Sequence, residues 1–397
     1  MIRTGIIILL TLILKSCSGQ MNPIRTGAEQ LEKYLPLLEN KHVAIVANQT
    51  SVIGETHLVD TLNRLAEDHF QIRNIMKVFV PEHGFRGNID DGVVVEDEID
   101  PVTGIPMVSL YGKHKKPSSE DMEGVDLVIF DIQDVGARFY TYISTLHYVM
   151  EACAENNVPL LVLDRPNPNG GYVDGPILEP HYSTFVGMHP IPVVYGLTIG
   201  ELAQMINSER WLLDSMQCDL TVIPCENYYH GKSYSLPVKP SPNLPNDHAI
   251  KIYPSTCFFE GTVISEGRGT QMPFEVYGHP DLPGTFSFVP ESIEGMSMHP
   301  KLKGETCYGE DLRGFYPEGG WHRLELRWLL DAYRKFPDKK NFFRPFFESL
   351  AGTDVLRKQI IAGWSEQQIR DSWEAGLRDY RDKRKKYLIY NDRASRK

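Results

Sequence analysis

Short apolar stretches alternate with helical patterns over the first 225 residues, and this alternation restricts the possible fold more than any other feature of the chain. Strands are predicted near 43–47, 75–80, 125–130, 158–163 and 220–223. These stretches are apolar throughout rather than alternately polar, which is typical of parallel strands buried on both faces. The sequence therefore predicts an α/β fold with a Rossmann-like parallel sheet domain covered by helices.

The motifs that usually bring nucleotides or acyl groups to such a sheet are missing from the sequence. Neither G-x-G-x-x-G after the first strand nor G-x-x-x-x-G-K-[ST] occurs, so we expect a sheet domain without a nucleotide site. The G-x-S-x-G elbow of serine hydrolases is absent too. The net charge of −11, from 41 basic and 52 acidic residues, argues against nucleic acid as a partner.

A proline-rich stretch at 236–245 separates this region from a less regular second half. Such a stretch is stiff and extended, and it indicates a connection between domains. We expect a Rossmann-like N-terminal domain over 22–228 and a smaller α+β auxiliary domain over 236–397, with the active site in the cleft between them. Capping boxes at 198–201 and 365–368 predict the start of one helix in each domain.

Residues 1–17 have the pattern of a secretory leader. Arg3 precedes an apolar run at 5–14, which is too short to span a bilayer comfortably. Cys17 then stands where a bacterial lipoprotein is processed and lipidated, and a plain signal peptide is the alternative. We expect an exported protein of the periplasm or the outer membrane of a Gram-negative-type envelope, with membrane contact only through this lipid anchor.

Polar side chains follow four of the predicted strands at the point where each strand ends. Because parallel sheets bind ligands beyond the carboxyl ends of their strands, we expect these groups to converge at one edge. The candidates of this edge are Asn48; Glu82, His83 and Arg86; Asp131, Gln133, Asp134, Arg138 and Tyr140; and Arg165 and Asn167. In the second half, Glu260, Glu266 and Arg268 stand among glycines and small polar residues, in loops that suit a surface closing over the cleft.

Glycoside cleavage needs an acid on the leaving oxygen and a base or nucleophile on the other face of the sugar. Glu82 directly follows an apolar strand, where partial burial would raise its pKa toward that of a general acid. Asp131, Asp134 and Glu266 compete for the second role, and an N-acetyl group of the substrate is a further nucleophile. Structural alternatives stay open: a loop-shaping ion pair for Glu82, a helix cap for Asp134, a pair with Arg268 for Glu266, and a plain turn for 164–171.

Several long segments, in order, resemble one known family. The matching segments are 81–87 (Pro-Glu-His-Gly-Phe-Arg-Gly), 109–112, 130–142, 163–168, 196–203, 240–245 and 260–270. In them the chain resembles the bacterial exo-β-N-acetylmuramidases of glycoside hydrolase family 171, long known as a domain of unknown function. The resemblance implies release of N-acetylmuramic acid from the non-reducing end of peptidoglycan fragments, as in cell-wall recycling. It also implies that Glu82 is catalytic. We expect no cofactor and no metal.

The substrate that the resemblance implies carries a lactyl carboxylate, for which an arginine clamp is expected. The candidate clamps are Arg86, Arg138, Arg165 and Arg268. Two other functions stay open: an envelope lipoprotein that binds wall sugars without cleaving them, and a metal-dependent envelope hydrolase that uses His83 and Asp131. The sequence leaves the oligomeric state open.

Overall fold

The computed structural model describes residues 22–67, 73–81, 84–86 and 98–392. Three of the residues predicted to be functional, Cys17, Glu82 and His83, lie outside this part of the chain. None of the helices within it combines the length and the apolar character needed to cross a bilayer.

A seven-stranded sheet forms the N-terminal half, in the order β5-β6-β4-β1-β7-β8-β9. Neighbouring strands are parallel except for β5, which is antiparallel to β6. The strands are β1 (His42–Ala47), β4 (Asn74–Val80), β5 (Glu98–Ile99), β6 (Pro106–Ser109), β7 (Leu127–Asp131), β8 (Leu160–Leu163) and β9 (Leu220–Ile223). The predicted α/β class and the parallel Rossmann-like sheet are therefore confirmed.

Helices cover both faces of this sheet, as the continuous apolar strands require. In β1, Val43, Ile45 and Ala47 pack with residues of α1 (Leu31–Tyr34) and α2 (Leu58–Glu67). The alternate residues Ala44 and Val46 face a second core, which contains α3 (Tyr142–Asn156) and α4 (Ile199–Ser208). A two-stranded hairpin, β2 (Val52–Ile53) and β3 (Thr56–His57), follows β1.

A smaller second region has its own antiparallel sheet, in the order β10-β12-β11. Its strands are β10 (Val276–His279), β11 (Phe286–Phe288) and β12 (Cys307–Asp311). Its helices are α5 (Asp247–Thr256), the 3₁₀ helix η4 (Cys257–Gly261), α6 (Arg327–Lys335), α7 (Phe346–Ala351), α8 (Val355–Ile361) and α9 (Glu366–Arg384). The capping boxes predicted at 198–201 and 365–368 are present at the starts of α4 and α9.

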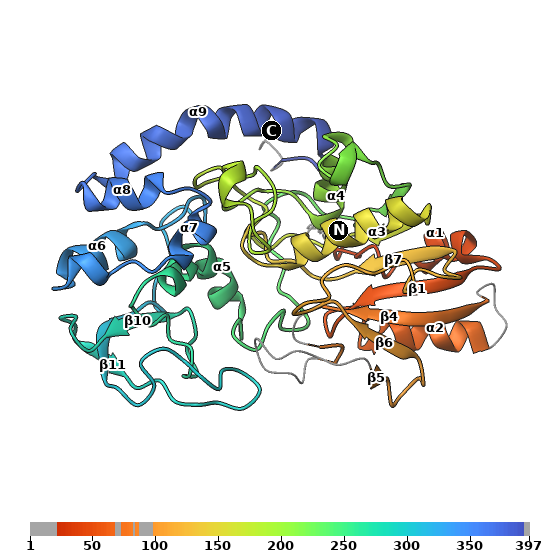
Figure 1. Cartoon of the computed structure of the whole chain (residues 1–397), viewed down its shortest axis with the longest axis horizontal. Helices are drawn as coiled ribbons and strands as arrows, with labels where there is room; N and C mark the ends of the chain where they lie inside the picture. The colour runs from red at the N-terminus through yellow and green to blue at the C-terminus, as the bar shows by residue number, and fades with distance from the viewer. Residues whose placement is uncertain (1–21, 68–72, 82–83, 87–97, 393–397) are drawn as a thin grey trace, which may run out of the picture.

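Helix α9 crosses back over the N-terminal half, above the parallel sheet (Figure 1). The Tyr380 hydroxyl donates a hydrogen bond to the Tyr195 carbonyl at 2.7 Å, and Arg384 Nε donates to the Gly196 carbonyl at 2.8 Å. Beyond the helix, the Tyr390 hydroxyl donates to the Asp164 carboxylate at 2.6 Å. The end of the chain is therefore built into the N-terminal domain, and the two regions share a large hydrophobic core.

Candidate active site

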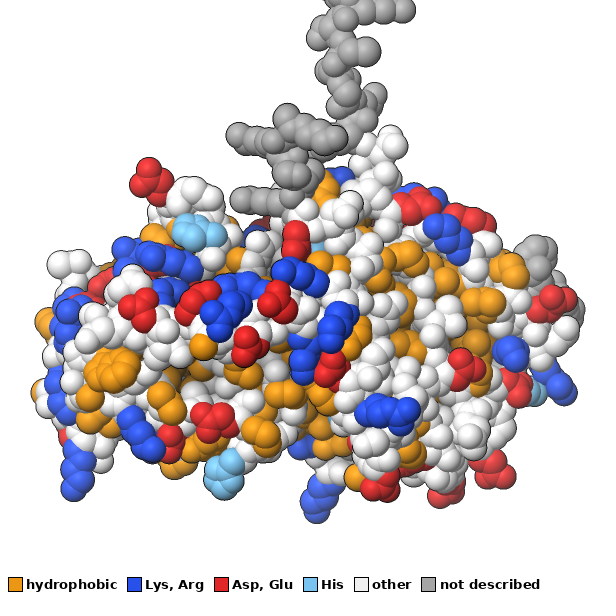
Figure 2. Space-filling model, turned by 90° about the horizontal axis from the view of Figure 1, so that it is seen from above, with side chains coloured by type: hydrophobic (Ala, Val, Ile, Leu, Met, Phe, Trp, Pro, Cys, Tyr) orange, Lys and Arg blue, Asp and Glu red, His pale blue; other side chains and the backbone are white. Residues whose placement is uncertain are grey.

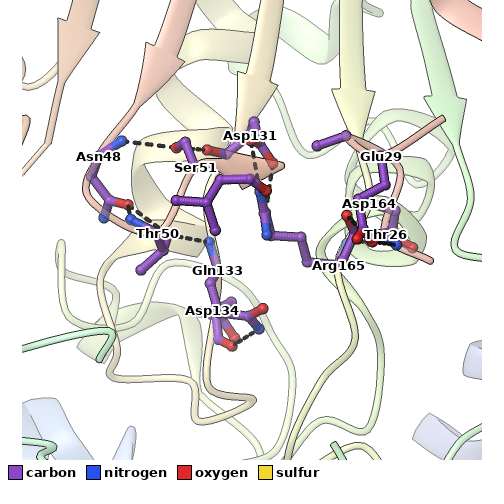
Figure 3. A network of polar contacts seen from close by, with 12 residues as sticks. Thr26, Glu29, Asn48, Thr50, Ser51, Asp131, Gln133, Asp134, Asp164 and Arg165 are labelled. Atoms are coloured by element: carbon purple, nitrogen blue, oxygen red, sulfur yellow. Dashed lines mark hydrogen bonds and ion pairs between the residues drawn. The ribbon is translucent and has the colours of Figure 1, made fainter. Parts of the chain in front are cut away.

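The loops after β1 and β7 are joined by a chain of hydrogen bonds at the carboxyl edge of the sheet (Figure 3). Asn48 Oδ1 accepts from the Thr50 amide and from the Thr50 hydroxyl, at 2.9 and 2.6 Å. The Thr50 hydroxyl oxygen in turn accepts from the Gln133 amide at 3.0 Å, and the Ser51 hydroxyl donates to the Asp131 carbonyl. Asn48 and Gln133 are buried. Their observed contacts hold the edge of the sheet in place.

Asp131 and Arg165 form a buried bidentate ion pair at the adjacent ends of β7 and β8 (Figure 3). Arg165 Nε lies 2.6 Å from Asp131 Oδ1 and its Nη2 lies 2.8 Å from Oδ2. The exposed fractions are 0% for Asp131 and 2% for Arg165. Burial disfavours the guanidinium charge, but Asp131 more than offsets this, so the pKa of Arg165 is raised. The pair does not line the cavity described below, and the catalytic role of Asp131 and the clamping role of Arg165 stay predictions.

Asp134 lies below this edge in a closed environment. Its Oδ2 accepts from the Gly136 amide at 2.6 Å and from the Tyr195 hydroxyl. Burial raises the pKa of its carboxyl group to about 7. Asp134 does not line the cavity described below. The predicted helix cap is wrong, because Thr141 is the N-cap residue of α3 and Asp134 instead accepts from the Gly136 amide within a turn.

Arg138 is buried among backbone carbonyls rather than exposed to a ligand. Its guanidinium donates to the carbonyls of Pro176, Ile191 and Leu350, at 2.8, 2.7 and 2.9 Å. Burial without an acidic partner lowers the pKa of this group to about 9. The predicted substrate clamp does not fit this position, because the donors already tie together three separate segments.

Asn167 and Arg86 also use their polar groups within the protein. Asn167 Nδ2 donates to the Leu197 carbonyl at 2.7 Å and its Oδ1 accepts from the Asn169 amide at 2.7 Å, which is a turn. Arg86 Nη2 lies 2.8 Å from carboxylate oxygens of both Asp60 and Asp100. The hydrogen bonds that the Arg86 guanidinium donates to Asp100 and Asp60 raise its pKa. Neither residue lines the cavity described below, and their substrate contacts stay predictions.

A cavity opens between the N-terminal sheet domain and the second region. The segment before α3 contributes Tyr140 to its wall, and α3 contributes its first residue, Tyr142. The helix η4 and the loop after it contribute Glu260 and Arg268. The remaining lining residues are Phe139, Thr141, Val186, Ser241, Asn243, Leu244, Tyr253 and Phe274. The structure thus brings three predicted site residues, Tyr140, Glu260 and Arg268, together in an interdomain cavity.

We call this interdomain cavity the cleft cavity. A cluster of charged side chains forms one of its walls. Arg268 lies 2.8 Å from Glu260 Oε1 and over the ring of Phe274, with 5.0 Å between its guanidinium carbon and the ring centroid. Behind it, Glu266 is buried, 2.7 Å from Lys301 Nζ and 3.7 Å from Arg268 Nε. The side chains of Glu260 and Arg268 are both 20% exposed. Glu266 supports the cluster from behind, whereas Glu260 and Arg268 reach the cavity surface.

The proline-rich connection is part of the cavity wall, which the sequence analysis missed. The Pro240 carbonyl accepts from the Tyr140 hydroxyl at 2.7 Å and from Gln49 Nε2 at 3.1 Å, which fixes the connection against the sheet edge. Asn243 is buried, its Nδ2 donates to the Met296 carbonyl at 2.9 Å, and its Oδ1 has no partner within the described residues. The available signal was the occurrence of 240–245 among the family-like segments.

The described residues contain no group of three or more His, Cys, Asp or Glu side chains placed to hold a metal ion. The Asp131 oxygens, which the metal-hydrolase hypothesis needs, are both engaged by Arg165. His83, the other residue of that hypothesis, lies outside the described residues.

Comparison with known families gives two adjoining matches. Residues 43–248 match the family described as "Exo-beta-N-acetylmuramidase NamZ, N-terminal", and residues 251–390 match "Exo-beta-N-acetylmuramidase NamZ, C-terminal". The border between the two matches falls just after the proline-rich connection, at the start of α5.

Individual proteins show the same similarity over almost the whole chain. The "Peptidoglycan beta-N-acetylmuramidase NamZ" of Bacillus subtilis (strain 168) is 39% identical, with 95% of this chain and 94% of that protein covered. A crystal structure of a DUF1343 family protein from Bacteroides fragilis NCTC 9343 is 47% identical, with a TM-score of 0.85 and 94% and 100% coverage. A second DUF1343 protein of that strain is 29% identical, with a TM-score of 0.77 and 93% and 99% coverage.

Proposed function

The chain belongs to the exo-β-N-acetylmuramidase NamZ family, and we propose that it removes N-acetylmuramic acid from the non-reducing end of peptidoglycan fragments, with the sugar held in the cleft cavity. It is a glycosidase, and peptidoglycan-derived muramic acid saccharides are its substrates. The observation that carries the assignment of the site is the cleft cavity itself, where tyrosines, an amide and a Glu–Arg pair meet at the junction of the two regions.

Arg268 is our assignment for the clamp on the lactyl carboxylate. All four candidate arginines have partners within the protein: Arg86 two carboxylates, Arg165 Asp131, Arg138 three carbonyls, and Arg268 the carboxylates of Glu260 and Glu266. Arg268 is the member of this set that lines the cleft cavity. Its fork of N–H groups matches a carboxylate bidentately, and Glu260 and Phe274 hold the guanidinium in one orientation.

The two chemical roles of glycoside cleavage are assigned to Glu82 and Glu260. Glu82 protonates the oxygen of the leaving sugar, as the family resemblance implies. Asp131, Asp134 and Glu266 do not line the cleft cavity, whereas Glu260 does. Glu260 is therefore our choice for the second carboxylate, on the opposite face of the anomeric carbon, and participation of the N-acetyl group of the sugar is the alternative.

Turnover of 4-nitrophenyl β-N-acetylmuramide tests the proposed function, with the corresponding N-acetylglucosaminide as the control that lacks the lactyl carboxylate. We expect release of nitrophenol from the muramide and little from the control. Saturable calorimetric binding of N-acetylmuramic acid without turnover at high enzyme concentration would support the non-catalytic binding protein instead. Loss of turnover after exhaustive chelation would support the metal-dependent hydrolase, and retained turnover would exclude it.

We also propose that the protein is exported and anchored to the envelope by lipidation of Cys17. The support is the charged start, short apolar run and cysteine of residues 1–17. In cells, the wild-type chain should partition into the membrane fraction with an acylated N-terminus by mass spectrometry. The Cys17→Ser chain should lose the acyl group, and an unmodified wild-type N-terminus would contradict the proposal.

A further inference from the structure

A second cavity, of about 450 Å³, lies beside the C-terminal part of α9, and it shares no lining residue with the cleft cavity. We call it the basic cavity. Its wall contains residues 170–173, His230 in the segment after β9, and four residues of α9. Lys385 and Asp392, which follow α9 in the sequence, complete it. The charged and polar side chains that line it are His230, Arg378, Arg381, Arg384, Lys385, Asp382 and Asp392.

The basic cavity carries an excess of positive charge on a chain whose net charge is −11. Four permanently cationic side chains and two carboxylates line it, which leaves a net charge of +2 on the wall. Asp392 engages Arg384 at 2.7 and 2.9 Å, and Asp382 engages Lys385 at 2.8 Å. The carboxylates paired with Arg378 and Arg381 do not line the cavity and are 79% and 63% exposed, so solvent screens them.

His230 supplies a buried nitrogen that faces the glycine wall of this cavity. The residue is 1% exposed, and its Nε2 lies 3.0 Å from the Glu201 carboxylate, so Nε2 carries a hydrogen. Its Nδ1 is buried and has no partner among the residues that the structure describes. A side chain at Gly170 would come within 3.1 Å of Nδ1. With a hydrogen on Nε2, Nδ1 is an acceptor that no donor among the described residues satisfies.

The first described residues lie next to the basic cavity. The Pro23 carbonyl accepts from Asn227 Nδ2 at 3.0 Å, and the Asn22 carbonyl accepts from Lys232 Nζ at 3.5 Å. Asn227 and Lys232 flank His230 in the sequence, so residues 22 and 23 contact the segment that contributes His230 to the cavity wall. Figure 2 looks onto this side of the molecule from above α9 and shows basic side chains crowded over the helix, with acidic ones between them.

We propose that the basic cavity binds a phosphate monoester. Arginine forks form charge-assisted, bidentate hydrogen bonds with phosphate oxygens, and a mobile lysine adds a point charge. Arg378, Arg381 and Lys385 provide these groups, and His230 Nδ1, an acceptor when Nε2 carries the hydrogen, accepts from the P–OH of a monoprotonated phosphate. The phosphate comes either from a soluble phosphorylated compound or from a lipid head group, which the proposed lipid anchor on Cys17 would bring near.

Calorimetric titration of the full mature chain with glycerol 3-phosphate tests the site, and glycerol serves as the neutral control. The variant is Arg381→Gln with Lys385→Gln, two side chains that are 41% and 67% exposed. The matched control is Arg334→Gln with Lys358→Gln, which removes the same charge from exposed ion pairs that do not line the cavity. All three proteins should turn over the muramide at the same rate, which reports correct folding independently of phosphate binding.

We expect the cavity variant to bind glycerol 3-phosphate at least about tenfold more weakly than wild type, and the control variant to bind like wild type. The proposal is overturned by an absence of saturable binding to wild type up to about 10 mM, or by an equal loss in the two variants. Flotation with vesicles that contain phosphatidic acid distinguishes a lipid head group from a soluble phosphate monoester as the ligand. Vesicle binding that the cavity variant loses indicates a lipid head group, and binding of glycerol 3-phosphate alone indicates a soluble ligand.

Discussion

Replacing Arg165 by methionine should destabilise the fold strongly, because it leaves the Asp131 carboxylate buried without its partner. Both oxygens of Asp131 are engaged, at 2.6 and 2.8 Å, and neither residue is more than 2% exposed. Breaking a buried ion pair from one side costs about 3–5 kcal/mol. Arg165 also donates to the Val52 carbonyl at 3.0 Å, and the loss of this bond adds about 1 kcal/mol. The expected loss is therefore a large share of a typical unfolding free energy.

Urea unfolding followed by circular dichroism measures this loss. Arg313→Met is the matched control, because Arg313 forms a bidentate pair with Asp311 at 2.9 and 2.7 Å, but on the surface, with 49% of its side chain exposed. The control should lose less than about 1 kcal/mol. An Arg165→Met loss no larger than the control would refute the reasoning.

The pair also decides between two roles for Asp131. In a double-mutant cycle, Asp131→Asn with Arg165→Met should be less destabilised than the sum of the single variants, because the remaining charge is no longer stranded. An Asp131→Asn protein with wild-type stability and no turnover would instead return Asp131 to the catalytic machinery.

Three further predictions concern the site. Glu82→Gln should fold normally and lose muramide turnover by at least about 100-fold, because the proton donor is gone; retained turnover removes Glu82 from the mechanism. Arg268→Lys should lower kcat/KM for the muramide by roughly 10–100-fold through loss of a bidentate charged contact, without affecting residual N-acetylglucosaminide cleavage; equal losses on both substrates would contradict the clamp. The raised pKa of Asp134, about 7, contributes stability that is complete below its unfolded pKa near 3.8 and lost as pH rises through 7. The unfolding free energy of Asp134→Asn, measured by urea unfolding, should therefore fall less steeply between pH 4 and 8 than that of wild type. The difference in slope should be at most about 1.4 kcal/mol per pH unit, and equal slopes for the two proteins would contradict the prediction.

Five of the seven strands were predictable because each carries its own apolar signal, whereas the short strands β5 and β6 were not predicted. The parallel arrangement follows from the helices between the strands. The gathering of Asn48, Asp131 and Arg165 at one edge follows from the same rule. The pairing of Asp131 with Arg165 was not predictable, because it depends on β7 and β8 being neighbours and on the direction in which each side chain leaves its strand.

The roles of single side chains were less predictable where their partners are distant in the sequence. Arg138 bonds carbonyls that lie 38, 53 and 212 residues further along the chain, and no local pattern predicts such contacts. The 240–245 stretch was interpreted as a connection because its prolines indicate an extended segment. That interpretation describes its conformation, but the cleft cavity uses Ser241 and Asn243 of the same stretch as wall residues.

A crystal structure of the protein with N-acetylmuramic acid tests the central claim most directly. We predict the sugar in the cleft cavity, with its lactyl carboxylate within hydrogen-bond distance of the Arg268 guanidinium and with Glu82 and Glu260 on opposite faces of the anomeric carbon. A sugar bound elsewhere, or one whose carboxylate is held by Arg86, Arg138 or Arg165 after rearrangement of the pairs described above, would contradict it.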